Sequence, residues 1–232
     1  MKPLHLRPIK VSLPAMTTKK RKRSPKQVPA PPSTPPTPQT QARHSLNTAK
    51  ARVWAPLNLT QAELSLQLTF PTGQTFRWKN TAPLQYTGLV GPHLITLKHL
   101  QNGDVSYCLH SHSNPEKAKT ALLDFLNAAV SLADLWKAFS ASDARFAALA
   151  LHLSGARVLR QDPFECLIQF LCSSNNNIAR ITKMVDHVSS LGMHAGDVGG
   201  FQFHVFPSLE QLSSVSEQQL RDAGFGYRFI SY

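Results

Sequence analysis

The stretch from Asn58 to His112 contains short runs in which apolar and polar residues alternate, a pattern typical of β-strands that bury one face. Tight-turn signals separate these runs at Pro71–Gly73, Gly91–Pro92 and Asn102–Gly103, and the Asn-Gly pair is a strong hairpin signal. The expected strands cover residues 64–70, 76–78, 86–90, 94–98 and 105–109. Strands joined by such short turns predict an antiparallel sheet.

The pattern changes to helical spacing at Asn114, where the sequence Asn-Pro-Glu indicates the start of a helix. The expected helices cover residues 114–130, 132–139, 145–153, 163–171, 176–191 and 209–223, with a loop between the last two. Strands that are followed by helices, rather than alternating with them, predict an α+β fold. In this fold an N-terminal antiparallel β-sheet packs with helices.

A run of five polar residues, Ser173–Asn177, interrupts an otherwise apolar helical segment. Upstream, Asp162–Glu165 has the form of a helix start, and the apolar residues that follow it are expected to form a buried face. Ser174 or Asn175 is expected to cap the next helix. Buried amides need hydrogen-bond partners, and asparagine can bind a base edge through two hydrogen bonds. The polar gap and the arginine after it, Arg180, therefore predict a surface that reads nucleobases.

Charge divides the chain into two parts. Residues 1–62 contain 12 of the 25 lysines and arginines and no acidic residue, whereas residues 63–232 contain 13 basic and 13 acidic residues. The first part also holds 11 of the 17 prolines. Such a segment buries too little apolar surface to offset its ordering entropy, so residues 1–52 are expected to form a disordered, basic, proline-rich arm.

Five consecutive cations in this arm predict a nuclear import signal or a tether to nucleic acid. They are Lys19, Lys20, Arg21, Lys22 and Arg23. The alternatives are a solvated charge run without a receptor and an organellar transit peptide, although the early prolines oppose the amphipathic helix of a transit peptide. The expected location is the nucleus, with organellar targeting as the alternative and a nuclear import receptor as the expected partner.

The remaining ~170 residues are enough for one globular core of ordinary size. No stretch approaches the ~20 apolar residues that cross a bilayer, so no membrane association is expected. The three cysteines are odd in number, and Cys166 and Cys172 have no histidine pair near them in the sequence. Neither a disulfide framework nor a zinc site is expected, and no metal or cofactor is implied.

Five segments resemble, in order and in spacing, the eukaryotic 8-oxoguanine DNA glycosylases, and in particular the plant-type members. They are Phe70–Trp78, Gly91–Leu94, Arg157–Pro163, Cys172–Met184 and Gly224–Arg228. The resemblance implies DNA base-excision repair, with removal of 8-oxoguanine opposite cytosine and then cleavage of the abasic strand. It also implies a sheet-and-helix domain at 53–155 and part of a helical DNA glycosylase domain at 156–232. The protein would act as a monomer on damaged double-stranded DNA.

The resemblance assigns roles to five residues. Asn175, Arg180 and Arg228 would contact the cytosine that is left unpaired when the lesion is flipped out, and Tyr227 would wedge into the vacated stack. The Gly73 carbonyl would accept the N7 proton that 8-oxoguanine carries and guanine lacks. From the residues alone, the alternatives are a helix cap, a surface arginine, a core tyrosine and an ordinary turn glycine.

In the family that these motifs resemble, a lysine amine attacks the sugar C1′ with help from an aspartate. Both belong to a helix-hairpin-helix element that follows a Leu-Pro-Gly-Val-Gly type loop. No such loop and no matching lysine occur before Tyr232. The expectation is therefore a truncated chain that binds damaged DNA and is inactive as it stands. A non-catalytic DNA-binding or regulatory product is the alternative function.

Overall fold

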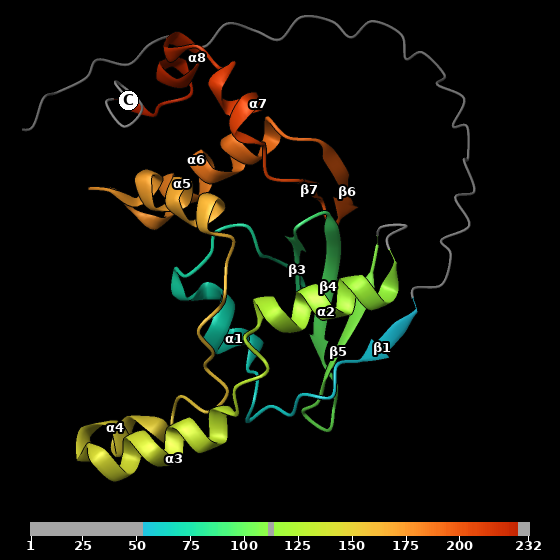
Figure 1. Ribbon diagram of the computed structural model, residues 1–232, viewed down its shortest axis with the longest axis vertical. Helices are drawn as coiled ribbons and strands as arrows, with labels where there is room; N and C mark the ends of the chain where they lie inside the picture. The colour runs from blue at the N-terminus through green and yellow to red at the C-terminus, as the bar shows by residue number, and fades with distance from the viewer. Residues whose placement is uncertain (1–52, 111–113, 227–232) are drawn as a thin grey trace, which may run out of the picture. The chain divides into compact units, whose positions relative to one another are not determined.

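The structure is a computed structural model that describes residues 53–110 and 114–226, all of which belong to one compact unit (Figure 1). Its main sheet is antiparallel, with the strand order β1–β5–β4–β3–β2. The strands are β1 (Trp54–Pro56), β2 (Lys79–Ala82), β3 (Gln85–Val90), β4 (His93–His99) and β5 (Val105–Leu109). The antiparallel sheet and its three long strands, β3 to β5, are confirmed.

The two faces of this sheet bury different residues, because side chains alternate along each strand. On one face, Tyr86 and Leu97 pack in a core with Leu122 and Phe125. The last two belong to α2 (Pro115–Phe125), which lies across the sheet (Figure 1). This face carries the larger of the hydrophobic cores.

On the opposite face, Leu89 and Leu94 pack against Val198 and Phe203. The last two belong to a two-stranded sheet formed by β6 (His194–Val198) and β7 (Phe201–His204). The prediction of a loop in this region is wrong. Each of these strands buries a single apolar side chain, so the alternating pattern is too weak to stand out among the glycines.

An aromatic stack joins the chain before β2 to the sheet and to α2. The Trp78 ring centroid lies 4.3 Å from that of Phe70 and 5.7 Å from that of Phe125. Gly88 of β3 lies directly against the Trp78 ring, because a Cβ at this position would come within 2.4 Å of a ring atom. Only glycine allows this approach.

The strand predicted at 64–70 is wrong. This segment contains α1 (Leu66–Thr69) and the 3-10 turn η1 (Phe70–Thr72), and the Ser65 hydroxyl caps α1 by accepting a hydrogen bond from the Leu68 N–H. Leu64 is fully buried all the same. The alternating leucines suggested a strand, but the structure also buries the intervening Ser65 and Thr69, so the burial does not follow the period of a strand. The run at 76–78 is also not a strand, since β2 begins at Lys79.

The remaining helices confirm the predicted order with shifted ends. They are α3 (Leu132–Ser142), α4 (Ala144–Ala150), α5 (Pro163–Ser173), α6 (Ile178–Ser190), α7 (Leu209–Ser213) and α8 (Glu217–Asp222). The predicted helix at 209–223 is two short helices, and α2 ends before residue 130. The Asp162 carboxylate caps α5 as predicted, 2.9 Å from the Glu165 N–H. The α+β fold class is confirmed.

Across residues 53–110 and 114–226, every helix is too short or too polar to cross a membrane.

One buried arginine, Arg157, ties distant segments together. Its guanidinium donates to the carbonyls of Glu63, Asn127 and Val130 at 2.6, 2.8 and 3.0 Å, and it also pairs with the Glu63 carboxylate. That carboxylate in turn accepts the first backbone N–H groups of α3, beginning with Leu132 at 3.0 Å. The chain before α1, the end of α2 and the start of α3 therefore meet at a single side chain.

Replacing Arg157 with Met should lower the free energy of unfolding by about 3–5 kcal/mol, because three carbonyls and a carboxylate lose their donor. Urea denaturation measures the change. The matched control is Arg160→Met, which removes a solvent-exposed pair with Asp124 and should cost about 0–1 kcal/mol. Equal losses in the two variants would show that Arg157 is not the junction.

Candidate functional site

The turn between α5 and α6 is held by two of its three asparagines. The Asn176 amide donates to the Cys172 carbonyl at 2.9 Å and lies 3.2 Å from the Met184 sulfur, so it fastens the end of α5 to α6. Asn177 is the N-cap of α6, and its side-chain oxygen accepts the Arg180 N–H at 3.0 Å. Two of the three amides therefore have structural roles.

Asn175, the first of the three, has a different position. It is exposed in the turn and has a left-handed backbone with φ of 45°, which asparagine tolerates better than most residues. The prediction that Ser174 or Asn175 caps the second helix is wrong, because Ser174 ends α5 and Asn177 caps α6. A cap needs the extended backbone that Asn177 has. Capping therefore does not explain Asn175.

The buried face predicted for α5 is wrong in part. Leu167 and Phe170 are 57% and 75% exposed, whereas Gln169 and Cys172 are buried. Ile178, at the start of α6, is exposed as well. Leu167 and Phe170 therefore lie on the surface of the described part of the chain, whereas Ile168 packs against the core that α5 shares with α6.

Arg180 connects the first turn of α6 to the end of the described chain. Its guanidinium donates to the Gly224 carbonyl at 2.7 Å. The neighbouring Phe225 is fully buried in the core formed with α6 residues such as Ile181 and Val185. The segment that leads to Tyr227 and Arg228 is thereby anchored beside Arg180. Tyr227 and Arg228 themselves lie outside the described residues, as do Lys19–Arg23.

Gly73 follows η1 with a left-handed backbone, φ 82°, and a Cβ added there would meet no atom within 4 Å. Its conformation favours glycine, whereas the space beside it is open. The residue lines a cavity of about 420 Å³ whose wall also includes Ile178 and Thr182 of α6. The structure thus brings two of the sequence-predicted elements, the Gly73 loop and the start of α6, to one cavity.

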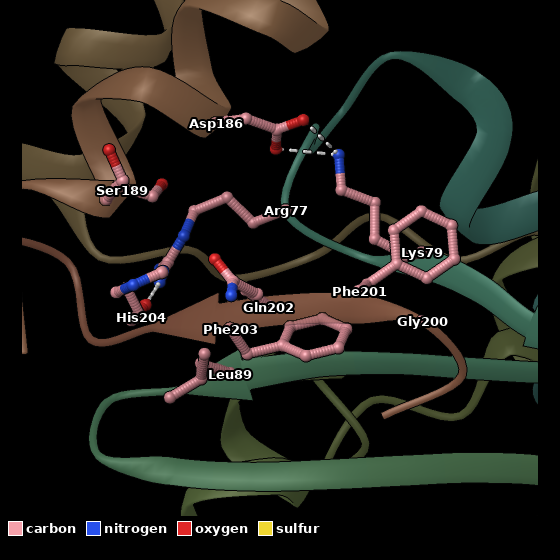
Figure 2. A pocket seen from close by; sticks show the side chains of 11 residues that line it. Arg77, Lys79, Leu89, Asp186, Ser189, Gly200, Phe201, Gln202, Phe203 and His204 are labelled. Atoms are coloured by element: carbon pink, nitrogen blue, oxygen red, sulfur yellow. Dashed lines mark hydrogen bonds and ion pairs between the residues drawn. The ribbon is translucent and has the colours of Figure 1, made fainter. Parts of the chain in front are cut away.

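Charged residues join the Gly73 loop and β2 to the helices. Arg77, which is 6% exposed, pairs with Glu165 of α5 and donates to the His204 carbonyl of β7. Lys79 pairs with Asp186 of α6 at 2.7 Å. Figure 2 shows Lys79 and Asp186 pointing toward one another, with Arg77 reaching His204, around a second cavity of about 280 Å³.

Glu165 is the most electrostatically unusual acid of this junction. Burial raises its pKa above the usual value, and the neighbouring Arg77 opposes that rise without cancelling it. The Glu165 carboxylate also accepts a hydrogen bond from the Gln169 amide at 3.1 Å, and the Gln169 side-chain oxygen accepts the Phe76 N–H at 3.0 Å. Glu165 therefore orders both Arg77 and Gln169 around the loop.

Sequence reasoning missed this polar junction. The available signal was the placement of Gln74 and Arg77 between aromatic residues of a segment expected to be buried, since a buried cation requires an acid elsewhere in the chain. The three cysteines form no disulfide bond with one another. Among the residues that the structure describes, no three His, Cys, Asp or Glu side chains gather closely enough to hold a metal ion.

Residues 56–167 match the family model of the N-terminal domain of 8-oxoguanine DNA glycosylase. The chain is also 65% identical over 189 residues to the N-glycosylase/DNA lyase OGG1 of Arabidopsis thaliana, a match that covers 81% of this chain and 51% of that protein. The chain carries the N-terminal domain of the 8-oxoguanine DNA glycosylase family. The resemblance inferred from the five motifs is confirmed.

Two further comparisons extend this assignment. The N-glycosylase/DNA lyase of Saccharomyces cerevisiae is 35% identical over 184 residues, covering 74% of this chain and 48% of the yeast protein. A crystal structure of the Clostridium acetobutylicum 8-oxoguanine glycosylase/lyase, in complex with double-stranded DNA containing cytosine opposite 8-oxoG, aligns with a TM-score of 0.63 and 25% identity. It covers 72% of this chain and 56% of that one. The chain therefore spans about half the length of its relatives.

The stability of this chain should depend on pH through Glu165. A raised pKa means that the protonated carboxyl stabilises the fold: the contribution is complete below the unfolded pKa of about 4.3 and is lost as the pH rises through the folded pKa. Glu165→Gln stays neutral, so wild type should lose stability relative to this variant as the pH rises from about 4 toward neutral. Urea denaturation across this range measures the difference. A difference that instead grows in favour of wild type would mean that pairing with Arg77 outweighs burial.

Proposed function

We propose that this chain recognises 8-oxoguanine opposite cytosine in duplex DNA, as part of base-excision repair. The observation that carries the proposal is the cavity of about 420 Å³ that Gly73 lines together with the start of α6. It joins a backbone group suited to reading the lesion to the start of α6, whose first turn contains Arg180 and which follows the turn that contains Asn175. The names of the relatives, N-glycosylase/DNA lyases, and the DNA complex of the bacterial structure support it.

The Gly73 carbonyl acts as the lesion sensor in this proposal. 8-Oxoguanine carries a proton on N7, which a carbonyl can accept as a hydrogen bond, whereas guanine presents a lone pair that a carbonyl repels. The left-handed backbone of Gly73 and the open space beside its Cα support the assignment, since a base edge could approach the main chain there. The sensor would therefore separate the damaged base from the normal one.

Asn175 and Arg180, with Arg228, read the unpaired cytosine. An unpaired cytosine offers an amino donor and two acceptors, which match an amide oxygen and arginine N–H groups. The hydrogen bond from Arg180 to Gly224 supports this grouping, because it draws the segment before Tyr227 and Arg228 to the same helix start. Tyr227 would occupy the vacated stack, and the inserted ring would offset part of the extrusion cost of a few kcal/mol.

For the whole protein we propose the activity that its relatives' names carry, release of the damaged base and cleavage of the abasic strand. Within it, this chain supplies the reading of the lesion and of the opposite base. The basic run Lys19–Arg23 supports a nuclear location through an import receptor, and it also supports a tether to DNA.

Asn175→Ala should reduce the preference for cytosine opposite the lesion. Fluorescence anisotropy on duplexes with 8-oxoguanine opposite cytosine or adenine gives the ratio of the two affinities, which should shift by about 1–3 kcal/mol toward equality. Wild type should favour the cytosine duplex and should bind it more tightly than an undamaged guanine–cytosine duplex. Equal wild-type affinity for all three duplexes would refute the proposed function.

The matched control is Asn177→Ala, a substitution of the same type two residues away. It removes the cap of α6 and should cost about 1 kcal/mol of stability while leaving the opposite-base ratio unchanged. If Asn175→Ala behaves in the same way, losing stability and keeping the ratio, then Asn175 is a turn residue and does not read the base.

Deleting residues 1–50 should weaken nonspecific DNA binding and reduce its dependence on salt. The net positive charge of the chain lies in its first 62 residues, so most of the counterions released on binding should come from contacts with this arm. The slope of log affinity against log salt concentration on an undamaged duplex measures the effect. An unchanged slope would exclude the arm as a tether.

A further inference from the structure

Gln74, the residue that follows Gly73, has a side-chain amide that behaves like a short piece of β-strand. Its nitrogen donates to the Arg157 carbonyl at 2.9 Å, and its oxygen accepts the Leu159 N–H at 3.0 Å. Arg157 and Leu159 are buried and Val158 between them is exposed, which is the alternation that an extended backbone produces. In such a segment the carbonyl of one residue and the N–H of the second residue after it point to the same side. The amide of Gln74 matches both groups.

Additional bonds hold the rest of the loop to the same segment. The Gln161 amide donates to the Gln74 carbonyl at 2.5 Å, and the Gln74 amide nitrogen lies 3.2 Å from the Thr72 hydroxyl. The Thr72 hydroxyl itself donates to the Thr69 carbonyl at 2.8 Å. Gly73 is therefore flanked on both sides by residues whose positions are fixed, although its own Cα borders open space.

No other common side chain satisfies this arrangement. Glutamate has no donor for the Arg157 carbonyl at neutral pH, methionine offers neither group, and asparagine is shorter by one methylene. The orientation of the amide is also fixed, because exchanging its oxygen and nitrogen would set two acceptors and two donors against each other. The segment that Gln74 binds is itself held in place, because Arg157 pairs with Glu63.

We propose that Gln74 is a specificity-positioning residue that fixes the direction of the Gly73 carbonyl. A carbonyl that separates 8-oxoguanine from guanine by a single hydrogen bond does so only when its direction is fixed, because a mobile carbonyl can turn away from the guanine N7. Gln74 touches no DNA in this role and acts through Gly73. The inference rests on the proposed function for its effect on specificity, but not for its effect on the loop.

The test uses the full chain with Gln74→Met, which keeps the length of the side chain and removes both hydrogen-bonding groups. The matched control is Gln211→Met, which removes a side-chain hydrogen bond to the Ser208 N–H at the start of α7. Hydrogen exchange of residues 70–78 should be about tenfold faster or more in Gln74→Met, because two hydrogen bonds between the loop and 157–159 are lost. The control should leave exchange of this peptide unchanged.

The second readout is the ratio of affinities for an 8-oxoguanine–cytosine duplex and a guanine–cytosine duplex. This ratio should fall by about threefold or more in Gln74→Met and stay constant in Gln211→Met, whatever the melting temperatures of the two variants. Unchanged exchange in residues 70–78 would overturn the proposal. Faster exchange with an unchanged ratio, in a background where wild type discriminates, would also overturn it and leave Gln74 a structural residue. If wild type binds both duplexes equally, the proposed function fails, and exchange alone decides whether Gln74 positions the loop.

Discussion

The structure depends on the cost of burying the Arg157 guanidinium. A buried cation is tolerated only when its donors are satisfied, and Arg157 obtains partners from the chain before α1 and from the residues after α2. Satisfying it fixes the path of residues 157–159, because the backbone on either side cannot move without breaking those bonds. The backbone of this segment then provides the carbonyl and the N–H group to which the Gln74 amide binds. An interaction far from Gly73 in the sequence thus determines where the Gly73 loop can lie.

A second polar layer fixes the helices against the same loop. Arg77, just before β2, pairs with Glu165 of α5. Lys79, the first residue of β2, pairs with Asp186 of α6. An apolar contact would tolerate sliding of the helices along β2, whereas ion pairs and hydrogen bonds fix direction as well as distance. These ion pairs therefore serve to fix the geometry of the helices more than to stabilise the fold. The burial that raises the pKa of Glu165 opposes the charged state that its pair with Arg77 requires.

Long elements with strong periodicity were predictable from the sequence, and short ones were not. Strands β3 to β5 were predictable from their alternating apolar and polar residues and from the Asn102–Gly103 turn. The helix at Leu66–Thr69 is too short to show a helical period, and the alternating leucines of the sequence around it imitate a strand. For the candidate site, the motifs located Gly73, Asn175 and Arg180. The partners of Arg77 and Gln74 could not be predicted, because they lie more than 80 residues away in the sequence.

The three asparagines illustrate why motif and structure are both needed. The sequence motif does not distinguish the three asparagines from one another, whereas the structure distinguishes them by their backbone conformation and their partners. Asn177 has the extended backbone that capping requires, and Asn176 turns inward to the Cys172 carbonyl. Asn175 has a left-handed backbone and lies in the exposed turn that follows the end of α5 at Ser174. The same division occurs in the Gly73 loop, where the Gln74 side chain is hydrogen-bonded within the fold and Gly73 borders open space. In both places a polar side chain that is fully engaged within the protein holds its neighbour in a conformation that faces outward.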